Sequence, residues 1–211
     1  NGYLFVSNSR GQTHAVYDKW KDVRTAFASA FGTNLTGWGD SWIDLRNTGT
    51  PQLLLANGAI PVTSLKRDAA ALQLIASVRG SWVNGGLLPG LTMNGRGLAA
   101  ADYDNDGRVD VAIGTVGGHL LLLHNTSPDT GNWLTVNVAP FSPGAVVTAV
   151  DSSGRTQTRV VTAGSSYLSS EDPRVHFGFG TAKPVRLTVR YPGGAVRSVK
   201  PRDDAIVTVT R

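Results

Sequence analysis

The chain has 211 residues and a formal net charge of +5, and it contains no cysteine. This length allows one or two domains with a buried core, and the lack of cysteine excludes a disulfide scaffold and a thiolate metal site. Only 17% of the residues are charged and 41% are hydrophobic, which excludes a disordered, highly charged chain. No apolar run approaches the ~20 residues of a membrane-spanning helix, so we expect no membrane span.

The acidic residues and the net charge are unevenly distributed. Fourteen of the fifteen acidic residues are Asp, which favours turns and loops that hold hard cations, and Glu171 is the only Glu. Residues 1–131 contain ten Lys or Arg and ten Asp, whereas residues 132–211 contain ten Lys or Arg and five acids. The whole net charge therefore lies in the second part, which predicts a domain boundary near Asn132.

Short apolar runs separated by turn residues predict β-strands throughout the first part. The expected strands are residues 3–7, 14–17, 41–45, 52–56, 98–102, 109–115 and 119–124. No long stretch has a clean apolar period of 3.6 residues, which disfavours long helices. Residues 69–78 fit either a short helix or an alternating strand, and we favour a strand in their second half.

The alternation of apolar and polar residues is sharper in the second part. It predicts strands at residues 133–138, 145–150, 156–163, 174–179, 185–191 and 205–210. So many short strands in so few residues indicate a compact β-sandwich or an open barrel.

The first part contains an internal repeat with an offset of 58 residues. The matching positions are Gly37, Gly39, Asp44, Asn47 and Gly49 in the first copy and Gly95, Gly97, Asp102, Asn105 and Gly107 in the second. A repeat with strand–loop–strand content is typical of propeller blades.

The second copy contains the strongest chemical signal in the sequence, a run of alternating carboxylates. Its candidate metal ligands are the side chains of Asp102, Asp104, Asp106 and Asp110 and the carbonyl of Arg108. Gly107 supplies the sharp turn, and hard oxygen ligands in a flexible loop suit Ca²⁺ better than Mg²⁺ or a transition metal. The alternative is an Asx-rich hairpin turn without metal, but that accounts for only one or two of the four carboxylates.

The loop is not a helical EF-hand, because its twelfth position is Ile113 where a bidentate Glu is needed. In the first copy, Arg46, Thr48 and Gln52 replace three of the carboxylates and Asp44 alone remains. We therefore expect no metal there, and we expect the charge of Arg46 to occupy the vacated place.

The sequence gives no firm catalytic motif. The four histidines lack a metal-ligand spacing, His119 and His124 fit strand ends or surface positions, and His176 fits a structural hydrogen-bonding role better than catalysis. Residues 164–172 form either a binding loop or a strand connection with Tyr167 and Leu168 in the core, and we favour the connection.

Aromatic and basic residues are the remaining recognition candidates. We expect Trp38 and Trp133 to pack in the core, and Trp82 is the tryptophan to test for exposure. The basic residues of the second part are scattered without a stacking pattern, which disfavours nucleic acid as a partner. Arg186 and Arg190 alternate in register and should share one solvent face.

These residues resemble two known families. The strand–loop–strand unit around Asp102 resembles FG-GAP/VCBS repeats, the blades of integrin-α-like propellers, strongly at residues 95–125 and weakly before them. The second part resembles the ASPIC/UnbV domain that follows such blades in bacterial relatives of cartilage acidic protein. The matching pieces are residues 132–136, 144–148, 154–161, 163–170, 172–180 and 189–196.

The resemblance implies an all-β chain with a partial β-propeller of FG-GAP/VCBS blades at residues 1–131 and a small β-sandwich-like ASPIC/UnbV domain at residues 132–211. It also implies an extracytoplasmic location, whether secreted, periplasmic or on the cell surface. Residues 1–131 supply two or three blades, whereas such propellers have about seven. We therefore expect the missing blades elsewhere in a longer chain or in a partner subunit.

Two functions follow as expectations. The first is a non-enzymatic, calcium-binding recognition or adhesion module for a protein, a glycan or an envelope component. The second is a structural or assembly ectodomain of a larger cell-envelope protein. An enzyme or enzyme accessory domain is a minor alternative that a pairing of His176 with a carboxylate would support.

Overall fold

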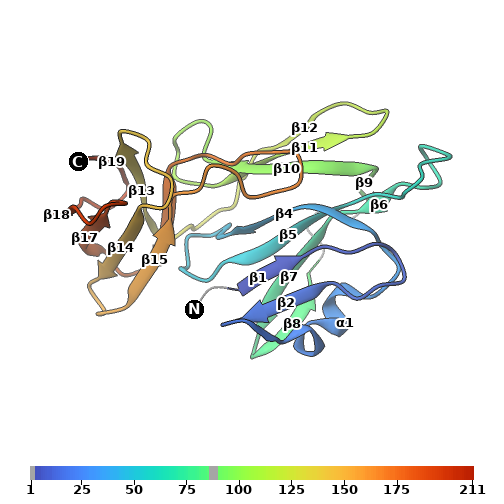
Figure 1. Ribbon diagram of the computed structural model, residues 1–211, viewed down its shortest axis with the longest axis horizontal. Coiled ribbons are helices and arrows are strands. Elements are labelled where there is room, and N and C mark those ends of the chain that lie inside the picture. Colours follow the sequence, from blue (N-terminus) through green and yellow to red (C-terminus); the bar gives the residue numbers. More distant parts are fainter. Residues whose placement is uncertain (1–2, 86–89) are drawn as a thin grey trace.

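The computed structural model describes residues 3–85 and 90–211, and nearly all of its regular structure is β-strand (Figure 1). The strands of the first part are β1 (Tyr3–Val6), β2 (Ala15–Asp18), β3 (Lys21–Asp22), β4 (Gly37–Ile43), β5 (Gln52–Asn57), β6 (Ala70–Ala71), β7 (Gln73–Val78), β8 (Ser81–Asn84), β9 (Thr92–Met93), β10 (Gly95–Ala101), β11 (Asp110–Thr115) and β12 (Leu121–Leu123). Those of the second part are β13 (Asn132–Ala139), β14 (Val146–Asp151), β15 (Thr156–Val160), β16 (Val175–Gly180), β17 (Pro184–Arg190), β18 (Val196–Val199) and β19 (Ala205–Thr210). The described helical elements are a 3₁₀ turn, η1 (Arg24–Ala26), and a single turn, α1 (Ala28–Phe31).

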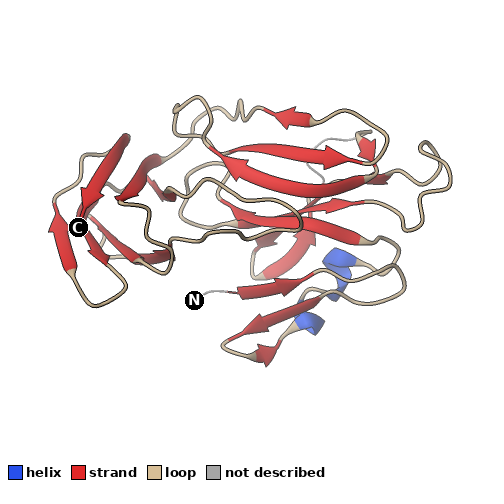
Figure 2. Cartoon of the chain, turned by 45° about the horizontal axis from the view of Figure 1, so that its top comes forward, coloured by secondary structure: helices blue, strands red, loops and turns tan. Residues whose placement is uncertain are grey.

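The first part is built from small antiparallel sheets. Their strand orders are β1-β2-β3, β4-β5-β7-β8 and β10-β11-β12, and β6 pairs with β9. Figure 2 shows these sheets grouped together, with the strands of the second part beyond their ends. The described sheets do not close into a barrel or a propeller, so the partial propeller stays a prediction.

The internal repeat of the sequence is also a repeat in the structure. The β4–β5 and β10–β11 hairpins have strand bounds that differ by 58 residues, and the β-bulges after Gly37 and Gly95 occupy the same place. Asn47 and Asn105 both have positive φ, 55° and 62°. The two segments therefore fold alike although most of the carboxylates are missing from the first.

The two hairpins pack against each other through β4 and β10. A Cβ on Gly39 would collide with the backbone of Arg96 and Leu98, so glycine is required for this close approach. Ile43, Leu54, Leu98 and Ile113 contribute to one buried apolar cluster that spans both hairpins. This cluster fixes the carboxyl end of β10, from which the Asp102 loop begins.

The first part also contains a separate cluster of aromatic side chains. Trp82 stacks on Phe27 with ring centroids 4.3 Å apart and also contacts Tyr3 and Trp42. Trp82 is thus a packing residue, and the highly exposed tryptophan is Trp20, with 88% of its surface accessible.

The second part has two sheets around one core. The sheet β16-β13-β19 contains a parallel β13–β19 pair, and the sheet β15-β14-β17-β18 is antiparallel. Leu134 and Phe177 of the first sheet and Val147 and Leu187 of the second belong to one buried cluster. This is the arrangement of a β-sandwich.

The structure confirms the expected strands to within a few residues, including the strand in the second half of residues 69–78. Several elements were not expected from the sequence. No strand was predicted at β8 or β18, and the short elements β3, β9, η1 and α1 were also missed. β8 and β18 are mostly exposed edge strands without a clear apolar alternation, which explains the first two omissions.

The long connection between β15 and β16 belongs to the second part, but it runs along β4 and β10 of the first part (Figure 1). Ser166 Oγ accepts a hydrogen bond from the Asp40 amide at 3.0 Å, Ser169 Oγ donates to the Leu98 carbonyl at 2.8 Å, and the Asp172 amide donates to the Ala100 carbonyl at 3.2 Å. The prediction that Tyr167 and Leu168 lie in the core is wrong, since 41% and 85% of their surfaces are exposed. Polar contacts hold the connection in place, together with the packing of the Tyr167 ring against Trp38.

Candidate functional site

The Asp102 loop has a tight backbone held by its own carboxylates. The Asp102 side chain is buried and accepts hydrogen bonds from the amides of Asp106 at 3.0 Å and Gly107 at 2.9 Å. Gly107 has φ of 84°, which permits the reversal that brings these amides back to Asp102. The loop is thus ordered by contacts that the alternating Asp residues make themselves.

The loop brings three of the predicted ligands together. Carboxylate oxygens of Asp102, Asp104 and Asp110 lie within 4.8 Å of one another, with Asp102 and Asp110 buried and Asp104 exposed. A second overlapping group contains Asp104, Asp106 and His124. His124 Nε2 lies 3.2 Å from Asp104 Oδ2. Sequence spacing did not indicate this contact, because His124 follows the end of β12 and lies outside the loop.

Arg108 contributes in a way that the sequence did not predict. Its guanidinium forms an ion pair with Asp106, and its Nε donates to the carbonyl of Asn125 at 2.7 Å. Asp106 is therefore partly neutralised by its own loop, whereas Asp102, Asp104 and Asp110 form the group that is open to another cation.

The electrostatics of these carboxylates favour a cation. Burial raises the pKa of Asp102, and backbone hydrogen bonds from Gly107 and Asp106 oppose it. Burial likewise raises the pKa of Asp110, and the hydrogen bond from the Asn125 amide opposes it. A hard cation would relieve the cost of holding these charges together, and the all-oxygen donor set fits Ca²⁺.

The equivalent loop of the first copy shows how its one remaining carboxylate, Asp44, is hydrogen-bonded. Asp44 accepts hydrogen bonds from the amides of Thr48 at 2.9 Å and Gly49 at 2.5 Å, the positions that match Asp106 and Gly107. The expectation that Arg46 occupies the vacated place is wrong, because its guanidinium donates to the Pro128 carbonyl instead. Two backbone amides and the Thr48 hydroxyl, which donates at 3.2 Å, are the partners of the single remaining carboxylate.

The second part forms direct hydrogen bonds with the Asp102 loop. Arg174, held by a salt bridge to Asp172, donates to the Asp102 carbonyl at 2.8 Å and to Asn105 Oδ1 at 2.7 Å. The Asp172 salt bridge raises the pKa of Arg174, so the guanidinium stays charged. The shape of the loop is thus coupled to the position of the β-sandwich.

A buried polar chain makes a second link between the parts. Asn47 Nδ2 donates to the Gly107 carbonyl at 2.7 Å, and Asn47 Oδ1 lies 2.8 Å from His176 Nε2. His176 Nδ1 lies 2.9 Å from Thr135 Oγ1. Burial, with the charges of Arg159 and Arg174, lowers the pKa of His176 to about 4.

His176 therefore has the structural hydrogen-bonding role that the sequence favoured. Its described hydrogen-bond partners are an amide and a hydroxyl, so the pairing with a carboxylate that would support catalysis is not among them.

Trp133 completes the contact between the parts. Its ring stacks on His176 with centroids 6.1 Å apart and lies where a Cβ on Gly107 would be. The expectation that Trp133 packs rather than binds a ligand agrees with this position. Trp38 also packs, with its indole N–H donating to the Gly58 carbonyl at 2.8 Å and its ring beside Tyr167.

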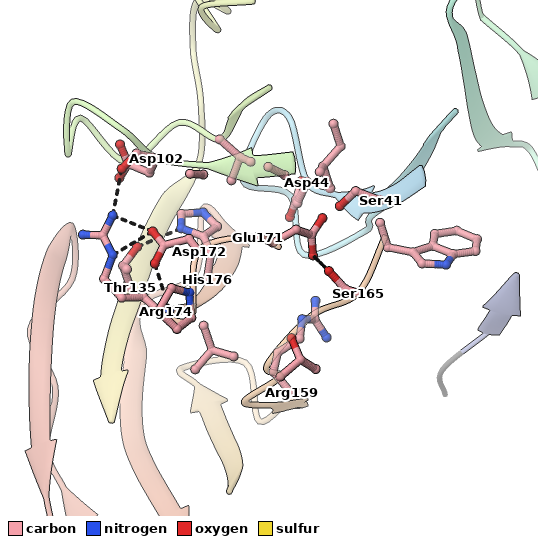
Figure 3. Close-up of a pocket in the computed structure, with 18 of the residues that line it drawn as sticks. Ser41, Asp44, Asp102, Thr135, Arg159, Ser165, Glu171, Asp172, Arg174 and His176 are labelled. Carbon is pink, nitrogen blue, oxygen red and sulfur yellow. Dashed lines mark hydrogen bonds and ion pairs between the residues drawn. The ribbon is translucent and has the colours of Figure 1, made fainter. Parts of the chain in front are cut away.

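A cavity of about 230 Å³ lies between the two parts (Figure 3). β4 supplies Ser41, Trp42 and Ile43 to its wall, β15 supplies Arg159, and the β15–β16 connection supplies Glu171. Figure 3 shows Glu171 beside Ser165, with the Asp172–Arg174–His176 group at one side. The cavity is separate from the cation loop, apart from sharing Asp102 in its lining.

Comparison with known proteins identifies the second part. The profile of the family described as "ASPIC and UnbV" matches residues 137–208, from within β13 to within β19. Residues 137–208 are an ASPIC/UnbV domain. This domain supplies Arg174, which donates to the Asp102 carbonyl and to Asn105 of the loop.

Weaker similarity extends to cartilage acidic protein 1 of three vertebrates. The Xenopus tropicalis protein is 28% identical over 109 residues, which are 48% of this chain and 17% of that protein. The Mus musculus and Homo sapiens proteins are each 27% identical over 111 residues, which are 49% of this chain and 17% of theirs. The chain thus spans about a sixth of the length of these relatives.

Two further predictions can be placed on the structure. Arg186 and Arg190 are both exposed on β17, as their alternation indicated. Among the described helices, none has the length and apolar character needed to cross a bilayer.

Proposed function

We propose that this chain is a non-enzymatic, extracytoplasmic recognition module in which an ASPIC/UnbV domain is docked onto Ca²⁺-stiffened FG-GAP/VCBS repeats. We assign the side chains of Asp102, Asp104 and Asp110 as the ligands, whereas Asp106, expected from the sequence as a ligand together with the Arg108 carbonyl, is paired with the Arg108 guanidinium. The cation has a structural role, because it neutralises the carboxylates of a loop to which Arg174 of the ASPIC/UnbV domain is hydrogen-bonded. The module binds a protein, a glycan or an envelope component.

The convergence of Asp102, Asp104 and Asp110 within 4.8 Å carries this proposal. Two of these carboxylates are buried with raised pKa values, so a bound cation offsets a cost that the folded chain otherwise bears. The first copy of the repeat supports the interpretation, since there the loss of three carboxylates accompanies hydrogen bonds to Asp44 from two amides and the Thr48 hydroxyl.

Thermal unfolding with calcium and with a chelator tests the proposal. At a free Ca²⁺ concentration about 100-fold above Kd, binding stabilises the fold by about 2.7 kcal/mol. For a chain of this size that corresponds to a rise in Tm of roughly 5–10 °C. The rise should vanish in Asp104→Ala and persist in the control Asp22→Asn, whose carboxylate pairs with Arg24 far from the loop. An equal Tm with calcium and chelator would contradict the calcium site.

A second candidate is a structural role in which further blades or a partner subunit cover the β12 edge. Leu120 and Leu122 at this edge are 72% and 55% exposed, which is unusual for two neighbouring leucines. Sedimentation tests this role: self-association or capture of the remaining blades supports it, whereas a folded, monodisperse monomer that binds no further blades counts against it.

A further inference from the structure

The cavity in Figure 3 contains charges of both signs that the protein does not pair with each other. Arg159 is half-buried at the end of β15, and burial lowers the pKa of its guanidinium. Its Nη1 donates to the adjacent Thr158 carbonyl at 3.2 Å, and its guanidinium lies 5.6 Å from the ring centroid of Phe177. Within the described part of the chain Arg159 forms no ion pair.

The negative charge of the cavity comes from the β15–β16 connection. Glu171 Oε2 accepts a hydrogen bond from Ser165 Oγ at 2.8 Å, but Glu171 Oε1 is buried without a hydrogen-bond partner among residues 3–85 and 90–211. Burial, and then the charge of Glu171, raise the pKa of the nearby Asp40 carboxyl to about 7. A buried acceptor without a donor is costly, so this end of the cavity favours a cationic group.

The other acidic side chains of the cavity are already engaged. Asp44 accepts backbone amides, Asp102 accepts the amides of its own loop, and Asp172 is paired with Arg174. The charge of Asp44 also acts on Arg159. Among the charged lining residues that the structure describes, Arg159 and Glu171 are the two without an ion pair within 4.0 Å or a full set of hydrogen bonds to their charged atoms.

The remaining wall is apolar and hydroxyl-bearing. Val160 and Val175 are among the apolar lining residues, and Ser41 and Thr162 add hydroxyl groups. Trp42 and Ile43 also line the cavity, but they are adjacent on β4 and belong to two different packed clusters of the first part. A volume of about 230 Å³ admits a small molecule and excludes a folded partner or a polymer segment of any length.

We propose that this cavity binds a small zwitterion of the α-amino-acid class with an apolar side chain. Its carboxylate pairs with the guanidinium of Arg159, its ammonium group donates to Glu171 Oε1, and its side chain packs against the apolar lining that includes Val160 and Val175. A ligand with one charge would leave either Arg159 or Glu171 without a partner, which is why the two charges are required together. The site uses none of the proposed calcium chemistry and goes beyond the recognition role proposed above.

Isothermal titration calorimetry on the full chain, at saturating calcium and neutral pH, tests this site with L-leucine and L-phenylalanine as probes. N-acetyl-leucine and leucinamide are the matched probes that lack one charge each. We expect binding of the zwitterions and a loss of about ten-fold or more in affinity for either analogue, because each lacks one charged hydrogen-bonding group.

Two variants assign the binding to the cavity. Arg159→Gln and Glu171→Gln should each weaken leucine binding about ten-fold or more, while the control Arg197→Gln, on the exposed edge strand β18, should leave it unchanged. Circular dichroism checks that each variant is folded. Glu171 lies in a connection outside the cores, so Glu171→Gln keeps the test decisive if Arg159→Gln does not fold.

Three results would overturn the proposal: no binding of any standard amino acid at millimolar concentration, equal binding of the single-charge analogues, or undiminished binding in both folded variants. Repeating the titration with a chelator and with Asp104→Ala separates this site from the calcium site. Leucine binding without any calcium response would remove the calcium proposal alone, and a calcium response without leucine binding would remove only this one.

Discussion

At the scale of single residues, Gly107 is a position of close contact between the loop and the second part. Its φ of 84° disfavours any side chain, and a Cβ there would also strike the Trp133 ring. Gly154 has the same φ of 84° but nothing within 4 Å of an added Cβ. The two glycines therefore separate the cost of backbone strain from the cost of the Trp133 contact.

We predict that Gly107→Ala lowers the free energy of unfolding by about 2 kcal/mol or more, and Gly154→Ala by only about 1 kcal/mol. Urea denaturation of both variants measures the difference. Equal losses would show that Trp133 moves freely and that the contact between the two parts is loose.

His176 makes stability depend on pH. Its pKa is about 4 in the folded protein and about 6.5 when unfolded, so the unfolded state binds more protons between these values. The stabilisation that neutral His176 gives the fold is fully present above about pH 6.5. As the pH falls towards 4 it is lost, which lowers the free energy of unfolding by up to roughly 3 kcal/mol.

Urea denaturation from pH 7 to pH 4 measures this loss, with His176→Gln as the comparison. The difference in unfolding free energy between the two proteins should shrink as the pH falls. Comparison of variants is needed because buried His14 also has a lowered pKa, while the raised pKa of Asp40 acts in the opposite direction over the same range. A difference that does not change with pH would contradict the role assigned to His176.

At the scale of elements, the β15–β16 connection positions the ASPIC/UnbV domain, and Arg174 is its main charged contact with the Asp102 loop. We predict that Arg174→Gln lowers the free energy of unfolding by about 1–3 kcal/mol, because it removes hydrogen bonds to the Asp102 carbonyl, Asn105 and Asp172. Arg186→Gln, at an exposed position on β17, should change it by less than about 0.5 kcal/mol. Thermal unfolding measures both losses. Equal losses of unfolding free energy in the two variants would contradict a specific contact between Arg174 and the loop.

The sequence predicted most strands because alternation and turn residues are local signals. It also predicted the 58-residue repeat, and the structure shows the same register and the same positive φ at Asn47 and Asn105. It did not predict the edge strands β8 and β18, which lack a buried face.

The loop's carboxylates were visible in the sequence, but their partners were not. The contacts of Arg174 with Asp102 and of His124 with Asp104 join residues that are far apart in the chain, and no spacing rule encodes them. The course of the β15–β16 connection was missed for the same reason, since Tyr167 and Leu168 look like core residues and lie at the surface.

At the scale of the whole molecule, the uneven charge coincides with two structural parts. The neutral residues 1–131 include the Asp102 loop, and the ASPIC/UnbV domain carries the basic residues, of which Arg155 and Arg174 reach across the contact. The clustered Asp residues and the basic domain thus face each other, and a cation in the loop would stiffen the surface on which the domain rests.

Calorimetric titration of the metal-free chain with Ca²⁺ is the sharpest test of the proposed calcium site in the Asp102 loop. We predict one site per chain, a clear preference for Ca²⁺ over Mg²⁺, and loss of binding in Asp104→Ala but not in Asp22→Asn. No heat of binding with Ca²⁺, or identical titrations of the wild-type protein and Asp104→Ala, would contradict it.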